Sequence, residues 1–162
     1  MRILIISQYF WPENFRVNDL AGEFVTRGHS VTVLTGRPNY PSGDIFPEYQ
    51  EDPDHFSNYA GADVVRVPLS PRGNSKFKLI LNYLSFVLWT CAVGPFKLRR
   101  RQFDVIFVFE PSPITVGIPA ALFRFLKSAP VVLWVLDLWP QTLRTVGEVR
   151  SPFLLSLIGK MV

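Results

Sequence analysis

The sequence predicts an α/β fold, a doubly wound parallel sheet with helices on both faces. Three observations lead to this fold class. Short apolar runs, typical of strands buried on both faces of a sheet, recur along the chain. A helical apolar pattern separates the first two runs, and polar turns rich in Gly or Pro end them. Alternation of this kind builds parallel sheets, and 162 residues suffice for one domain with its own core.

The first three elements form one strand–helix–strand unit. Ile3 to Ser7 is an apolar run that we interpret as the first strand. A helix is expected from about Phe15 to Arg27, with Asn14 capping its start and Gly28 ending it in a left-handed turn. Val31 to Leu34 is the second buried strand, reached by a right-handed crossover.

The remaining strands follow a long turn-rich segment at residues 36–61. A loop of this length inside a compact domain is usually functional or mobile. Three further strands are predicted, at Val64–Val67, Asp104–Phe109 and Val131–Leu136. The five strands are expected in the spatial order 3-2-1-4-5. Between the last two lies a helix with Ser112 as cap and Pro113 in its first turn. Pro119 inside it predicts a late start or a kink.

Ligands of doubly wound sheets bind beyond the carboxyl ends of the strands, so the loops after Ser7, Thr35, Phe109 and Leu136 are the candidate site. The first of these loops lacks the Gly-x-Gly-x-x-Gly fingerprint, which disfavours a nucleotide-dependent oxidoreductase. Only two histidines and one cysteine are present, and a metal site is not expected.

Three charged residues in these loops have both a functional and a structural interpretation. Asp137, directly after the fifth strand, is placed to act as a general base or to cap the following turn. Glu110, after the fourth strand, could contact a ligand or support a helix N-terminus. Arg16 could help a helix N-terminus bind phosphate, or lie in solvent paired with Glu13.

The run from Leu79 to Phe96 is strongly apolar and is flanked by cations: Lys76, Lys78, Lys97, Arg99, Arg100 and Arg101. As a helix it is marginal for a bilayer, Gly94-Pro95 should end it early, and a crossing would split the sheet. We therefore expect either a core helix or an interfacial helix that docks on anionic lipid, and favour one that does both. Its aromatic residues are not interleaved with the cations, which disfavours nucleic-acid binding.

The combination of segments resembles the N-terminal domain of retaining GT-B glycosyltransferases of family 4, of the bacterial O-antigen, capsule and colanic-acid type. The matching segments are residues 1–13, 27–36, 38–43, 110–113 and 136–140. The resemblance implies the Rossmann-like, acceptor-side half of a hexosyltransferase that needs no metal or other cofactor. In such enzymes the nucleotide-sugar donor binds mainly to a C-terminal domain.

The resemblance and the loop positions together give our site assignment. Asp137 is the catalytic candidate, and the substrate-binding candidates are Glu13, Asn14, Arg16, Asn39, Tyr40, Glu110 and Ser112. An apolar stripe still runs at Val162, so we expect 1–162 to be a single truncated domain without its donor domain, inactive by itself. The expected acceptor is a lipid-diphosphate-linked sugar, and the expected location is the cytoplasmic face of the cell membrane. The alternative is a non-catalytic Rossmann-like binding module.

Overall fold

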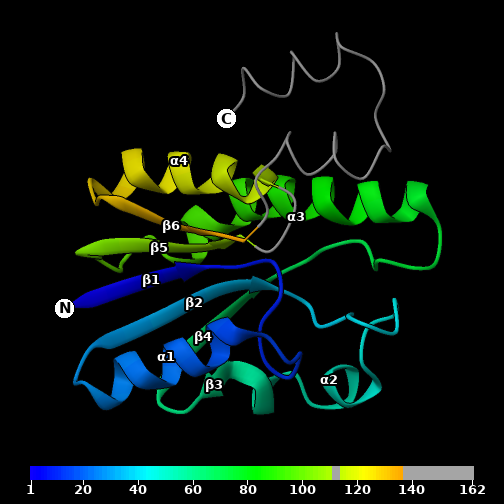
Figure 1. Cartoon of the computed structure of the whole chain (residues 1–162), viewed down its shortest axis with the longest axis horizontal. Coiled ribbons are helices and arrows are strands. Elements are labelled where there is room, and N and C mark those ends of the chain that lie inside the picture. Colours follow the sequence, from blue (N-terminus) through cyan, green and yellow to red (C-terminus); the bar gives the residue numbers. More distant parts are fainter. Residues whose placement is uncertain (111–113, 137–162) are drawn as a thin grey trace, which may run out of the picture.

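The computed structural model describes residues 1–110 and 114–136, which form one sheet with helices on both faces (Figure 1). The strands are β1 (Arg2–Ile6), β2 (Ser30–Gly36), β3 (Asn58–Tyr59), β4 (Ala62–Val67), β5 (Val105–Glu110) and β6 (Val131–Val135). The helices are α1 (Arg16–Thr26), α2 (Pro47–Glu51), α3 (Lys76–Lys97) and α4 (Gly117–Lys127), with short 3₁₀ turns η1 (Asp54–Ser57) and η2 (Ile114–Val116).

The strand order is β3-β4-β2-β1-β5-β6, and every pairing except β3 with β4 is parallel. This confirms the doubly wound sheet and the predicted order of the five longer strands. The antiparallel β3 was not predicted, because a strand of two residues leaves no periodic pattern in a sequence. It extends the sheet beyond β4, at the edge farthest from β6.

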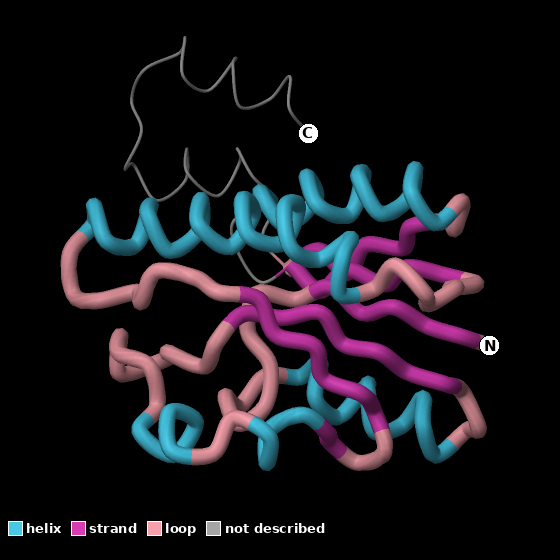
Figure 2. The backbone as a smooth tube through the Cα atoms, turned by 180° about the vertical axis from the view of Figure 1, so that it is seen from behind, coloured by secondary structure: helices cyan, strands magenta, loops and turns pink. Residues whose placement is uncertain are grey.

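Helices α1 and α2 lie on one side of the sheet, and α3 and α4 on the other (Figures 1 and 2). Two apolar cores result. The core under α3 and α4 contains Phe86, Leu98 and Phe123, whereas the core under α1 contains Phe10 and Val17. Leu4 and Ile6 of β1 face the first core and Ile3 and Ile5 the second, as the two-residue period of a strand requires.

Helix α1 begins at Arg16, so its N-cap is Phe15, and Phe15 makes no side-chain cap hydrogen bond. The predicted capping role of Asn14 is therefore wrong, because this exposed residue lies one position too early. Asn18 fixes the turn instead, since its Nδ2 donates to the Glu13 carbonyl at 2.7 Å and its Oδ1 accepts from the Trp11 N–H at 3.1 Å. The left-handed end of the helix at Gly28 is confirmed, with φ of 81°.

Helix α4 shows the late start that Pro119 predicted. The chain first makes the 3₁₀ turn η2, and the α-helix begins only at Gly117. Pro119 then lies in the first turn, where a backbone N–H would have no partner within the helix. The proposed cap Ser112 and Pro113 lie outside the described residues.

Helix α3 is longer than predicted, because Gly94-Pro95 does not end it and it continues to Lys97. Pro95 lies in the last turn, so its missing N–H removes only one helical hydrogen bond. Gly94 allows close packing on α4, since a Cβ there would lie 3.0 Å from the Phe123 ring. The Ser75 hydroxyl caps the other end by accepting from the Lys78 N–H at 3.2 Å.

Phe123→Ala should lower the free energy of unfolding by about 3–5 kcal/mol, because it empties a fully buried site between α3, α4 and the sheet. The matched control is Phe125→Ala in the same helix, where the ring is 83% exposed and little free energy should be lost. Urea unfolding followed by circular dichroism measures both. Equal losses in the two variants would contradict the assigned core.

Candidate functional site

Three loops gather at the carboxyl ends of the strands: residues 7–15 after β1, residues 37–46 after β2 and residues 68–75 after β4 (Figure 1). The N-terminal half of α3 lies against them, and hydrogen bonds of side chains and backbone groups join these four segments. The parallel sheet therefore brings together loops that are far apart in the sequence. They lie beyond the carboxyl ends of the strands, where the ligands of doubly wound sheets bind.

The carboxylate of Glu13 joins the first two of these loops. Its Oε1 accepts hydrogen bonds from the backbone N–H groups of Asn39 and Tyr40, both at 2.8 Å, and its Oε2 accepts from the Phe10 N–H at 3.0 Å. The residue is only 2% exposed. Burial raises the pKa of its carboxyl to about 7, although these hydrogen bonds and the charge of Arg66 act in the opposite direction.

Asn82 of α3 joins all three loops through four hydrogen bonds. Its Oδ1 accepts from Gln8 Nε2 at 2.6 Å and from the Tyr9 hydroxyl at 3.2 Å. Its Nδ2 donates to Asn39 Oδ1 at 3.2 Å and to the Ser70 carbonyl at 2.6 Å. The amide is completely buried and uses every donor and acceptor it has. A single side chain therefore sets the position of α3 relative to the loops.

Tyr9, Phe15, Tyr40 and Arg72 form what we call the aromatic platform. The Tyr9 and Phe15 rings are stacked with centroids 5.3 Å apart, and Tyr40 lies 5.5 Å from Tyr9 and 5.3 Å from Phe15. The Arg72 guanidinium lies 5.1 Å from the Tyr40 ring centroid and 3.5 Å from the Tyr9 hydroxyl. Within the described part of the chain Arg72 has no carboxylate partner, so its charge is available to an anion.

Arg66 has a structural position beneath the same edge. Its guanidinium donates to the Gly36 carbonyl at 2.7 Å and to the Trp11 carbonyl, and it lies 5.3 Å from the Tyr49 ring centroid. Burial lowers the pKa of this guanidinium to about 10, which leaves it charged at neutral pH. Arg66 thus connects the loop after β1 to the last residue of β2.

The structure distributes the predicted substrate-binding residues over different environments. Asn39 and Tyr40 belong to the hydrogen-bonded loops described above. Arg16 and Asn14 are exposed at the start of α1, and Arg16 makes no ion pair with Glu13, whose carboxylate is buried. Glu110 is fully buried at the carboxyl end of β5. Ser112 and the catalytic candidate Asp137 lie outside the described residues, so their roles stay predictions.

Sequence reasoning missed Tyr9, Arg72 and Asn82. Tyr9 lies in a loop that the sequence already marked, and Arg72 lies in a stretch without acidic residues, so both carried a signal. Asn82 lies inside the apolar run from Leu79 to Phe96, where a single polar residue gives no sign of a binding role. Its polar neighbours Ser85 and Thr90 follow at helical spacing, which is the pattern that could have indicated a polar inner face.

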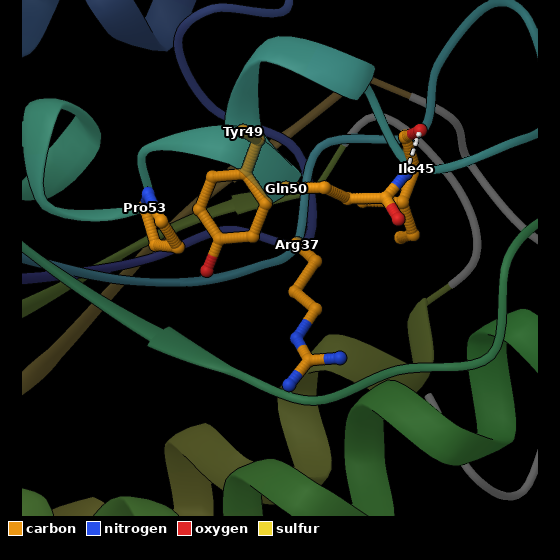
Figure 3. A pocket seen from close by; sticks show the side chains of 5 residues that line it. All are labelled: Arg37, Ile45, Tyr49, Gln50 and Pro53. Carbon is orange, nitrogen blue, oxygen red and sulfur yellow. Dashed lines mark hydrogen bonds between the residues drawn. The ribbon is translucent and has the colours of Figure 1, made fainter.

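The edge also carries two adjoining cavities around Tyr49, of about 430 and 230 Å³. The larger is lined by Arg37, Ile45, Tyr49, Gln50 and Pro53 (Figure 3). Among the residues that the structure describes, no cluster of three His, Cys, Asp or Glu side chains could hold a metal ion. The described side chains at this edge offer hydrogen-bonding groups, aromatic faces and positive charge.

A parallel doubly wound sheet with polar and aromatic loops at its carboxyl edge defines a Rossmann-like ligand-binding domain. Residues 14–158 match the family of glycosyl transferase 4-like domains, and the chain belongs to this family. The fold is that of the N-terminal Rossmann-like domain of GT-B glycosyltransferases, as predicted. No curated protein sequence matches the chain.

Solved structures share the fold at low sequence identity. The glycotransferase of kitacinnamycin is 16% identical with a TM-score of 0.58, over 91% of this chain and 34% of that one. The calicheamicin glycosyltransferase CalG4 is 17% identical with a TM-score of 0.57, over 98% of this chain and 42% of that one. The C-terminal domain of a hydrogenase from Pyrococcus furiosus, 17% identical, has a TM-score of 0.53 over 82% of this chain and 90% of that domain. The chain therefore spans less than half of either glycosyltransferase.

The Glu13 carboxyl should titrate with a midpoint near pH 7 in ¹³C NMR, because burial disfavours its charged form. The raised pKa means that its contribution to stability is full below about pH 4.5 and is lost as the pH rises through 7. Glu13→Gln removes the titrating group, so this part of the pH dependence should disappear in urea unfolding. A midpoint below pH 5 would contradict the inferred desolvation.

Proposed function

We propose that this chain is the acceptor-binding domain of a retaining glycosyltransferase that moves a sugar from a nucleotide-sugar donor to a lipid-diphosphate-linked acceptor in cell-surface polysaccharide synthesis. Family membership supports glycosyl transfer in general. The finer proposal depends mainly on one observation, the orientation of α3 next to the loops of the site.

Helix α3 buries three polar residues together with apolar ones such as Phe86, and it exposes much of its remaining apolar surface. Asn82, Ser85 and Thr90 are buried against the loops and the sheet. The exposed residues of the helix include Phe77, Ile80, Leu81, Leu84, Leu88, Trp89 and Phe96, between 43% and 75% exposed. This exposure supports the proposal of an interfacial helix over that of a helix that serves the core alone. An exposed apolar face of this kind favours a lipid interface.

Cations flank this apolar face at both ends of the helix. Lys76 and Lys78 lie at its start, Lys97 at its end, and Arg99 and Arg100 directly after it, all with exposed side chains. Arg101 differs, because it donates to Asp63 and Thr32, both at 2.9 Å, within the fold. We propose that the five exposed cations contact anionic headgroups while the apolar face enters the headgroup boundary.

The same helix is long and apolar enough to cross a membrane, judged by length and composition, and it is the one such helix among the described residues. A crossing is incompatible with the sheet, because β4 precedes α3 and β5 follows it, and both strands belong to the same sheet. We therefore propose a peripheral position at the cytoplasmic face of the membrane.

The aromatic platform supplies the proposed acceptor contacts. Arg72, which has no carboxylate partner among the described residues, offers its guanidinium for the diphosphate. The rings of Tyr40 and Phe15, both partly exposed, offer stacking surfaces for a sugar. Asp137 stays the proposed general base, and Arg16 a proposed phosphate contact. The alternative, a non-catalytic binding module, would use the same platform, and its distinguishing feature is the lack of transfer by the full-length protein.

Sedimentation with vesicles tests the membrane part of the proposal. The chain should pellet with vesicles that contain anionic phospholipid, and less as salt is added. Changing Arg99 and Arg100 to Ala should weaken binding, at roughly 1 kcal/mol for each charge. Arg27→Ala, an exposed arginine at the end of α1, is the control and should bind normally. Equal recovery on neutral and anionic vesicles would refute the docking surface.

Titration with a polyprenyl-diphosphate-linked hexose in detergent micelles tests the acceptor part. We expect NMR shifts at Tyr40, Phe15 and Arg72, and binding at least tenfold weaker in Arg72→Ala, because a charge-assisted contact to the diphosphate is lost. Arg27→Ala is again the control. The chain itself should not turn over any nucleotide sugar. Equal affinity for the hexose linked to lipid without a diphosphate would refute the role of Arg72.

A further inference from the structure

The segment between β2 and β4 borders an open pocket of about 430 Å³, and Figure 3 shows the side chains that line it. Helix α2 forms one wall, and Arg37, the residue after β2, forms another. The wall formed by α2 is held close to the end of β2, because the N–H of Phe46, just before α2, donates to the carbonyl of Pro38, just after β2, at 3.1 Å. The segment that the sequence marked as a long turn-rich loop is therefore folded around a pocket.

The polar groups of this pocket have defined orientations. Gln50 Nε2 donates to the Ile45 carbonyl at 3.1 Å, which fixes the amide and leaves its Oε1 as an acceptor. The Arg37 side chain makes no hydrogen bond or ion pair with any other described residue, so its guanidinium remains a donor. The pocket thus offers one oriented acceptor and one group of donors.

The apolar groups complement them. The Tyr49 ring is held in place by Arg66, 5.3 Å from its centroid, and by Phe56, 5.8 Å away. A fixed aromatic ring is a stacking surface for the C–H face of a sugar. Ile45 and Pro53 complete the lining on either side of it, and Ile45, which lies next to the Gln50 amide, suits a small apolar substituent such as a methyl group.

The surrounding charge argues for a neutral ligand. No carboxylate lines the larger cavity, but Asp44, Glu48, Glu51 and Asp52 are exposed in the same segment, and Asp54 lines the adjoining cavity. These acids oppose an anionic ligand, while Arg37 inside the pocket opposes a cationic one. A neutral group with one acceptor, one donor and one methyl fits both conditions.

We propose that this pocket binds an N-acetylated hexosamine unit. The acetamido carbonyl accepts from Arg37, the acetamido N–H donates to Gln50 Oε1, and the methyl group contacts Ile45. The pyranose ring stacks on Tyr49. The assignment of this unit to the acceptor glycan rests on the proposed function, whereas binding of the free sugar does not.

Saturation-transfer NMR with N-acetylglucosamine as the probe tests the proposal on the whole chain. The strongest transfer is expected at the acetyl methyl protons, and chemical-shift changes are expected at Ile45, Tyr49 and the Gln50 side-chain amide. Glucose and glucosamine should each bind at least tenfold more weakly, because they leave the oriented polar groups without partners. Glucuronic acid should also bind at least tenfold more weakly, because the surrounding acids oppose its charge.

Arg37→Ala and Gln50→Ala should each weaken binding of N-acetylglucosamine about tenfold or more, since both side chains are exposed and their loss spares the core. Arg27→Ala is the matched control and should bind as the unaltered chain does. Equal binding of glucose, tighter binding of glucosamine or glucuronic acid, or unchanged affinity in both pocket variants would overturn the proposal. No lipid or diphosphate is present, so failure here is distinct from failure of the acceptor titration.

Discussion

The arrangement of the site depends on the buried amide of Asn82. An unsatisfied amide in a protein interior costs on the order of 1–3 kcal/mol, whereas all four hydrogen bonds of this one are made. Its partners belong to the loops after β1, β2 and β4, so each loop is fixed relative to the same helix. Ser85 reinforces the link, because its hydroxyl accepts from the Ser70 N–H at 2.8 Å. The position of the aromatic platform follows from this network.

Glu13 also holds the loops together, through hydrogen bonds to the loops after β1 and β2. It was predicted as a substrate contact, and the structure places both its oxygens on backbone N–H groups of the loops after β1 and β2. Asn39 completes the link, since it donates to Glu13 through its backbone and accepts from Asn82 through its side chain. Two buried polar side chains thus align the loops that carry Tyr9, Tyr40 and Arg72.

The strands and their order could be predicted from the sequence, because apolar runs and short turns leave few ways to build a parallel sheet. The buried hydrogen bonds that hold the loops of the site could not be predicted. Glu13 and Asn39 were chosen by resemblance, and nothing in their sequence context shows that one is buried on backbone amides and the other on Asn82. Helix α3 shows the limit well: its composition predicts an apolar helix, but only tertiary structure decides which side faces the sheet. The end of α3 was misplaced because Gly94-Pro95 was taken as a stop, whereas the helix continues through Pro95 to Lys97.

The two faces of α3 are under different constraints, because the inner face contacts the loops of the site and the outer face is exposed. Substitutions on the inner face must preserve hydrogen bonds to the loops, so Asn82 and Ser85 have few acceptable replacements. On the outer face, residues such as Leu84 and Leu88 make little contact with the rest of the fold, and any apolar side chain would serve there. Substitutions on the outer face of α3 can therefore change the surface that the helix offers to an external partner, while the geometry of the binding loops stays the same.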